Sequence, residues 1–171
     1  IPGSAGNLSL AKSLFYALKS IGLRQVDRDF KQPVKFPAVT LADAQGGTAD
    51  LAVLFAAAYL AGSIPVKLAF SGDSPFIFFR AEKSAVEAMF GETASVGFSD
   101  AEGAFWVALE PAWISYEATF KEACEAGLRR YRAGAVRPEL VDIERAWAEG
   151  YTPFPVVITD DRRPDMEAVK R

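Results

Sequence analysis

The hydrophobic pattern of this chain has a helical period at both ends and a strand-like period in the middle. The apolar runs 66–70 and 76–79 flank a stretch that is dense in turn-forming residues, which is typical of a hairpin. Residues 23–39 contain two prolines and are predicted to be an extended connection. The predicted helices cover residues 10–21, 48–61, 84–90, 120–133 and 140–149, and the predicted strands cover residues 66–70, 76–79 and 105–109. This order predicts an α+β fold in which helices pack on a small antiparallel sheet.

The chain has 171 residues, half of them apolar, and this size suits one domain with its own core. We therefore predict a single domain over residues 1–159. Residues 160–171 mix acidic and basic side chains around a proline, which predicts a charged tail or a linker to another module. The chain opens on Ile1 and Pro2, without an initiator methionine or a basic leader, so we expect an excised or processed segment.

Charge and residue counts exclude several classes of function. The net charge of −3 gives no basic surface for nucleic acid, and no apolar run is long enough for a transmembrane helix. The single cysteine, Cys124, excludes an internal disulfide and zinc sites built on paired cysteines. The chain contains no histidine, which excludes Ser-His-Asp, Cys-His and histidine–metal sites within it. We accordingly expect no metal and no cofactor.

The order of several segments is similar to that of a known family. These segments are residues 34–41 (VKFPAVTL), 46–54 (GGTADLAVL), 63–68 (SIPVKL), 71–76 (SGDSPF) and 105–110 (FWVALE). Together they resemble the bacterial transglutaminase-like family of the papain-like superfamily, whose active members place glycine-aspartate-cysteine shortly before an aspartate-leucine pair. The resemblance covers roughly residues 8–151 and implies a transglutaminase-like, papain-like core.

Carried over along this resemblance, the catalytic triad of the family falls on residues that lack its chemistry. The nucleophilic cysteine corresponds to Thr48, the histidine to Ser74 and the carboxylate to Glu110. A threonine hydroxyl needs an adjacent base to act as a nucleophile, and serine is no base at neutral pH. Glu110 keeps its residue type but has no imidazole to orient. The resemblance therefore implies an inactive domain without catalytic residues.

Each residue of this degenerate site also has a structural interpretation. Thr48 is predicted to cap the helix that it begins, and Asp50 is favourable in the first turn. Ser74 fits a turn, whereas Glu110 fits an exposed carboxylate or the partner of an arginine. Trp106 is expected either to line the remnant cleft or simply to pack in the core.

Two further expectations concern the predicted helix over residues 120–133. Cys124 lies on its apolar face and is expected in the core, since an unpaired buried cysteine behaves as a small hydrophobe. Four arginines gather near its carboxyl end, and we expect them to form a solvated face that complements the helix dipole. These arginines are Arg129, Arg130, Arg132 and Arg137.

The favoured hypothesis is a catalytically inactive transglutaminase-like domain that serves as a structural or binding module of a larger protein. The resemblance implies a periplasmic or cell-envelope location, because family members of this kind are commonly exported and joined to other modules. The expected partners are other modules of the same polypeptide or envelope proteins. The apolar segment 151–158 is the predicted contact, and it either covers the domain's own core or docks on a neighbour.

Two alternative functions remain open. In the first, a remnant cleft binds a peptide or a glycan. In the second, a hydrolase with altered chemistry uses Thr48 or Ser74 together with Glu110 or Asp50. All of these hypotheses predict that Thr48, Ser74 and Glu110 converge in space. The residues expected to border the cleft are Thr48, Asp50, Ser74, Trp106 and Glu110.

Overall fold

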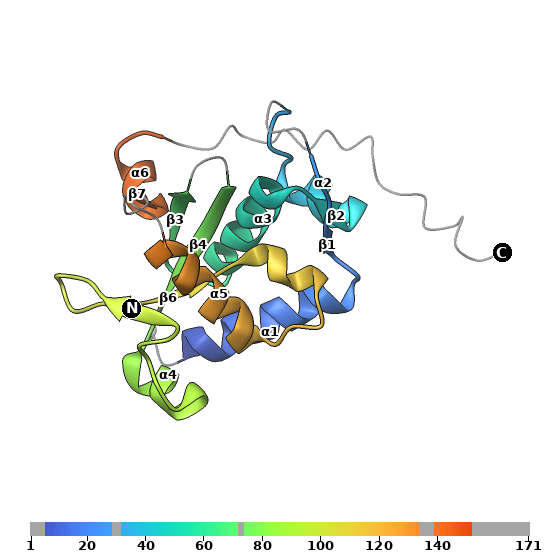
Figure 1. Ribbon diagram of the computed structural model, residues 1–171. Coiled ribbons are helices and arrows are strands. Elements are labelled where there is room, and N and C mark those ends of the chain that lie inside the picture. The colour runs from blue at the N-terminus through green and yellow to red at the C-terminus, as the bar shows by residue number, and fades with distance from the viewer. Residues whose placement is uncertain (1–5, 29–31, 72–73, 134–138, 152–171) are drawn as a thin grey trace.

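The computed structural model of the chain describes residues 6–28, 32–71, 74–133 and 139–151. It has an α+β architecture in which helices pack on an antiparallel sheet, and this confirms the predicted fold class (Figure 1). The elements are α1 (Asn7–Ser20), β1 (Arg24–Gln25), α2 (Pro37–Asp43), β2 (Gln45–Gly46), α3 (Thr48–Ala61), β3 (Val66–Ser71), β4 (Ser74–Ala81), α4 (Lys83–Phe90), β5 (Gly97–Ser99), β6 (Phe105–Leu109), the 3-10 helix η2 (Pro111–Ser115), α5 (Phe120–Ala133), β7 (Glu139–Asp142) and α6 (Ile143–Ala148).

Within the described residues, the larger sheet has the strand order β5-β6-β4-β3-β7, and each neighbouring pair is antiparallel. The β3–β4 hairpin pairs Val66 with Phe79 and Ser71 with Ser74, as predicted for the two central apolar runs. Strands β1 and β2 form a separate parallel pair, which precedes α3 along the chain.

The sequence prediction lacked β1, β2, η2, α2 and β5, and two of these omissions have a clear physical explanation. The first is α2, which replaces part of the predicted extended connection because Pro37 occupies its first position, where a missing N–H and a fixed φ are tolerated. The second is the short strand β5. It contains Gly97, and glycine is uncommon in strands, so the sequence pattern did not indicate one. A Cβ at Gly97 would collide with the carbonyl oxygen of Trp106, so a residue that weakens strands in general is required here.

The carboxyl-terminal part was predicted as one helix, and this prediction is wrong for its first residues. Leu140 belongs to strand β7, where it pairs with Ala69 of β3 and packs against the aromatic face of the sheet. The helix α6 begins later, after Asp142, whose Oδ1 accepts a hydrogen bond from the Arg145 backbone N–H at 3.1 Å. Leu140, Ile143 and Trp147 recur at helical spacing although Leu140 lies in the strand, because the helix begins directly after the strand without a loop.

Buried side chains cover both faces of the sheet. On one face, strands β4 and β6 pack against α1 and α3; their buried residues are Ile77, Phe79, Val107, Leu109, Phe15, Phe55 and Tyr59. On the other face, the same strands pack against α5; the buried residues there are Phe76, Phe78, Trp106, Ala108 and Leu128, and the half-buried Tyr131 packs against them. Cys124 of α5 is fully buried, which confirms its predicted place in the core.

Helix α5 crosses the end of β6 at very short range because residue 127 is glycine. A Cβ on Gly127 would lie 2.9 Å from the backbone nitrogen of Leu109 and 3.0 Å from that of Glu110. The Glu110 N–H donates a hydrogen bond to the carbonyl oxygen of Ala123, also on α5, at 3.1 Å. This close crossing sets the next turn of α5 beside Glu110.

Candidate functional site

Helix α3 begins at Thr48 and ends at Ala61, as its apolar run predicts. The prediction that Thr48 caps this helix is wrong, because Gly47 occupies the cap position with extended backbone. Thr48 is instead the first helical residue, and its Oγ1 accepts a hydrogen bond from Gln25 Nε2 at 3.3 Å. The helix start is capped by Asp50, whose Oδ2 accepts from the Gly47 backbone N–H at 2.8 Å.

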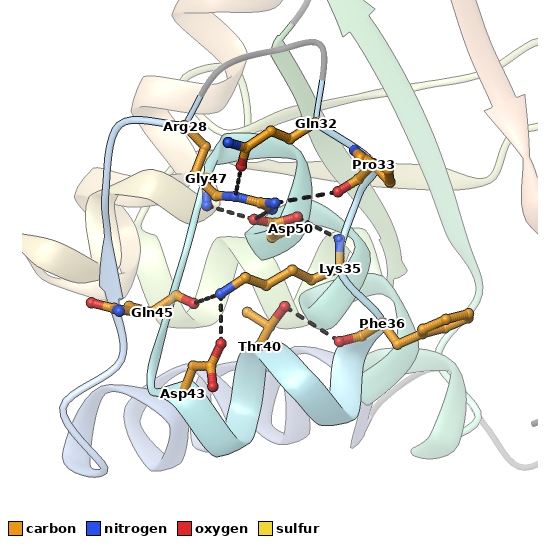
Figure 2. Close-up of polar contacts among 10 residues, drawn as sticks. All are labelled: Arg28, Gln32, Pro33, Lys35, Phe36, Thr40, Asp43, Gln45, Gly47 and Asp50. Atoms are coloured by element: carbon orange, nitrogen blue, oxygen red, sulfur yellow. Dashed lines mark hydrogen bonds and ion pairs between the residues drawn. The ribbon is translucent and has the colours of Figure 1, made fainter.

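The Asp50 carboxylate is buried at the start of α3, with 1% of the residue exposed. Its Oδ1 accepts a hydrogen bond from the Lys35 backbone N–H at 2.7 Å, and its Oδ2 also pairs with the Arg28 guanidinium. Figure 2 shows these donors converging on Asp50 from separate stretches of chain. The positive end of the α3 dipole adds to their attraction for the carboxylate. One side chain thereby ties the chain before α2 to the start of α3.

Both cations at this site make further bonds. Arg28 Nη2 donates to the carbonyl oxygen of Pro33 at 3.4 Å. Lys35 Nζ lies 2.6 Å from Asp43 Oδ2 and 3.4 Å from the carbonyl oxygen of Gln45 (Figure 2). The loop before α2, the end of α2 and strand β2 are therefore held together around the buried carboxylate.

The double glycine before α3 is explained by crowding around Asp50. A Cβ on Gly46 would lie 2.7 Å from Asp50 Cβ and 2.9 Å from Thr40 Cγ2. A Cβ on Gly47 would lie 3.2 Å from Arg28 Cβ. A side chain at Gly46 would displace the carboxylate from its donors, because both neighbouring atoms belong to buried residues.

Glu110 lies at the end of β6 and is 5% exposed, so the alternative of an exposed carboxylate is wrong. Its Oε2 pairs with the guanidinium of Arg130, and the same guanidinium donates from Nη2 to the carbonyl oxygen of Ser74. Arg130 also lies over the ring of Phe76, 5.0 Å from its centroid. Its side chain is 25% exposed, so the prediction of a solvated role fails for Arg130.

The structure brings Ser74 and Glu110 together through Arg130. Thr48 is connected to this pair indirectly, because Gln25 bonds both to Thr48 and to Ser115 of the helix that follows Glu110. Among the described residues, no hydrogen bond or ion pair joins Thr48 to Ser74 or to Glu110. The convergence of all three stays a prediction.

Trp106 has a packing role in this structure. It is 5% exposed, and its indole N–H donates to Asp100 Oδ2 at 2.8 Å. The Lys67 ammonium lies 4.0 Å from the centroid of the Trp106 ring.

Ser74 is the first residue of β4 and pairs with Ser71 of β3. The two residues between them, for which a turn was predicted, lie outside the described part of the chain.

Sequence reasoning missed Arg28 and Lys35, and it misassigned Arg130. The position of Arg130 carries a usable signal, since Ala123, Gly127 and Arg130 recur at helical spacing and so share one face of α5. Arg28 and Lys35 carry no comparable signal. They contact Asp50 from 22 and 15 residues away, across irregular chain that no periodicity describes.

Burial is the largest single influence on the pKa of Asp50, and alone it would raise that pKa. The hydrogen bonds from the Lys35 backbone, the Arg28 side chain and the Gly47 backbone together outweigh it, so the pKa lies below its usual 3.8. The pKa of Asp100 is lowered as well, chiefly by the hydrogen bond from Trp106. Both carboxylates therefore bind protons less readily in the folded state than in the unfolded chain.

This difference predicts acid-induced loss of stability. Because the folded pKa of Asp50 is depressed, its contribution is complete above pH 3.8 and is lost as the pH falls through the folded pKa. We expect the free energy of unfolding, measured in urea, to decrease steadily below this pH. Asp50→Asn should flatten that decrease, and an equally steep pH dependence in the variant would contradict the assignment.

Comparisons with protein-family models, with curated proteins and with solved structures gave no match to this chain. The described residues contain no group of three or more His, Cys, Asp or Glu side chains that could hold a metal ion. None of the described helices is long and apolar enough to cross a bilayer. The relation to the transglutaminase-like family stays a prediction from the residue pattern.

Proposed function

We propose that this chain is a catalytically inactive transglutaminase-like domain that acts as a structural or binding module of a larger cell-envelope protein. Its partners would be other modules of the same polypeptide or envelope proteins. The predicted contact segment 151–158 lies outside the described residues except for Tyr151, which is exposed. The proposal therefore depends on what occupies the positions of the family's triad.

The observation that carries the proposal is the bond pattern of Arg130. A guanidinium is charged at every accessible pH, so it donates hydrogen bonds but cannot accept a proton as an imidazole does. Arg130 pairs with the Glu110 carboxylate and donates to Ser74, at the positions where the family would have a carboxylate and a histidine. The Glu110 carboxylate, which corresponds to the residue that orients the histidine in active family members, is therefore paired with Arg130, and an arginine cannot act as a base.

The nucleophile position supports the same proposal. Thr48 Oγ1 accepts a hydrogen bond from the Gln25 amide, and an amide N–H is a donor that removes no proton from a hydroxyl. A threonine hydroxyl becomes nucleophilic only beside a general base. A thiol at the same position would also lack its base, because Ser74 cannot accept the proton at neutral pH.

The experiment is an assay of ester hydrolysis, amide hydrolysis and transamidation with the purified chain. We expect the wild type and Thr48→Ala to give the same rate as buffer, and Thr48→Cys to stay inactive because no base generates the thiolate. Thr48→Ala serves as the matched control for contaminating activity. Turnover by the wild type that disappears in Thr48→Ala would overturn the proposal and favour a hydrolase with altered residues.

A second candidate function is supported by one unsatisfied atom. Glu110 Oε1 is buried and accepts no hydrogen bond from any of the described residues. A buried carboxylate oxygen without a donor is costly, so a hydroxyl or N–H group of a peptide or glycan would stabilise it. Chemical-shift titration with short peptides and oligosaccharides tests this function. Binding that leaves the amides of Ser74, Glu110 and Arg130 unchanged would exclude this position as the ligand site.

A further inference from the structure

The strand β7 and the helix α6 that follows it are weakly packed, and we call these residues, 139–148, the strap. Within the described residues, β7 is the edge of the five-stranded sheet and pairs only with β3 (Figure 1). Glu139 of β7 is exposed, the rest of the strand is half-buried, and α6 has no buried residue. Few buried apolar side chains are typical of segments that open without unfolding the whole domain.

Backbone pairing with β3 is the main polar attachment of the strap. In the described part of the chain, the hydrogen bonds of its side chains link Arg145 to Asp142 and to Glu149, which belong to the strap themselves. An ion pair connects the strap to the rest of the domain, between Asp142 Oδ2 and Lys67 Nζ at 4.0 Å. The Asp142 side chain is 36% exposed, so this pair contributes little to stability.

Apolar packing of the strap is limited as well. Leu140 packs on the face of the sheet that α5 covers, and Ile143 packs against the cluster of α1 and α3, but both side chains are only partly buried. A pocket of about 620 Å³ is lined by residues of the strap, by Lys67 and by residues 100–102. Side chains therefore do not fill the space between the strap and the turn before β6.

The backbone of β3 alternates between its two neighbouring strands. The carbonyl oxygen of Pro65, just before β3, accepts a hydrogen bond from the N–H of Arg80 in β4. Because successive residues of a strand point their backbone groups to opposite sides, Lys67 and Ala69 face β4, whereas Leu68 faces β7. Opening of the strap would therefore uncover the N–H and C=O groups of Leu68 and leave the pairing of β3 with β4 intact.

The register of β7 shows which kind of strand fits this edge. Leu140 lies opposite Ala69, and Asp142 lies opposite Lys67. An uncovered strand edge binds an extended segment through backbone hydrogen bonds, and the neighbouring side chains select its sequence.

We propose that the strap opens from β3 while the rest of the domain stays folded, and that an extended segment of a partner module binds the uncovered edge in its place. The partner segment carries an apolar residue opposite Ala69 and a carboxylate opposite Lys67, as β7 does. This inference rests on the proposed function of a binding module, and it names the surface and the kind of contact that such a module would use.

Hydrogen exchange of the whole chain, followed by NMR, tests the opening. We expect the amides of Leu68 and Val141, which face each other across the two strands, to exchange with one common opening free energy. It should lie below the value for Lys67 and Ala69, whose exchange requires global unfolding. The same free energy and the same urea dependence for all four amides would mean that the strap opens only with the whole domain, which would overturn the proposal.

Two leucines of one apolar cluster provide matched variants. Leu140→Ala weakens the strap, so Leu68 and Val141 should exchange about tenfold faster, a modest effect for this substitution because Leu140 is only partly buried. The control is Leu128→Ala on α5, where the leucine is 1% exposed. It should accelerate exchange at Ala69 through global unfolding and leave Leu68 unchanged, because Leu128 stays packed when the strap opens. Equal acceleration of Leu68 in both variants would contradict the proposal.

A synthetic peptide with blocked ends that copies residues 139–143 tests the binding. We expect it to shift the Leu68 amide resonance saturably, with about tenfold higher affinity for Leu140→Ala than for the wild type, because the weakened strap competes less. The same peptide with proline in place of its valine lacks the N–H that faces Leu68 and should not bind.

The absence of peptide binding to Leu140→Ala, or equal binding of the two peptides, would overturn the proposal. Neither result changes the expected outcome of the activity assays on the wild type and Thr48→Ala. Failure of this inference and failure of the proposed inactivity are therefore distinguishable.

Discussion

Replacing Asp50 with alanine should lower the free energy of unfolding by about 3–5 kcal/mol, the usual cost of removing one partner of a buried ion pair. The Asp50 side chain is 2% exposed and that of Arg28 is 20% exposed. The substitution leaves the Arg28 guanidinium without its carboxylate. It also leaves the backbone N–H groups of Lys35 and Gly47 without an acceptor.

Urea unfolding followed by tryptophan fluorescence measures this loss. Asp50→Asn keeps an acceptor of the same shape but removes the charge, so its stability should lie between that of Asp50→Ala and the wild type. The control is Asp43→Ala, which breaks the bond from Lys35 Nζ at a carboxylate that is 44% exposed, and it should cost less than about 1 kcal/mol. If Asp50→Ala cost no more than Asp43→Ala, the carboxylate would not organise this region.

The local role of Asp50 could be predicted from sequence, whereas its long-range role could not. An acidic residue in the first turn of a helix is favourable wherever that helix lies, so the apolar run after Thr48 was sufficient to place it. Its burial and its bond to Arg28 depend on how the loop before α2 folds back over α3. No periodicity in that loop encodes this contact.

The fold likewise has elements that the local sequence predicts and elements that depend on tertiary contacts. Strands β4 and β6 were predictable because each contains a continuous apolar run, as expected for strands that are buried on both faces. Strand β3 was predictable from its apolar residues and from the turn-forming residues that follow it, although Lys67 interrupts the run. Strand β7 was taken for part of a helix because it has only four residues of mixed polarity and α6 follows it directly. Their strand conformation depends on pairing with β3, which is a tertiary contact.

At the candidate site, the chemical conclusions needed only residue types, whereas the geometry needed the structure. The absence of histidine and the presence of threonine and serine follow from the sequence alone. The pairing of Glu110 with an arginine was one of two expectations, and the structure selects Arg130. The position of Arg130 follows from the close crossing at Gly127, where a Cβ would meet the backbone of β6.

Arg130→Ala should also be strongly destabilising, by about 3 kcal/mol, because it leaves a buried carboxylate without its counterion. The Glu110 side chain is 7% exposed, so little water reaches it to replace the guanidinium. The carbonyl oxygen of Ser74 loses its donor in the same variant, and the ring of Phe76 loses its cation contact. Thermal and urea unfolding of the variant measure the combined loss.

A double-mutant cycle separates the ion pair from these other losses. Glu110→Gln removes the charge with little change of shape, and the double variant Arg130→Ala/Glu110→Gln contains no unpaired buried charge. We expect the double variant to be more stable than Arg130→Ala alone, with a coupling energy of about 1–3 kcal/mol between the two positions. Additive effects would mean that Arg130 acts through Ser74 and Phe76 instead. In that case the Glu110 carboxylate would be stabilised by something other than Arg130. The pairing of these two side chains would then no longer support the proposal that the domain is inactive.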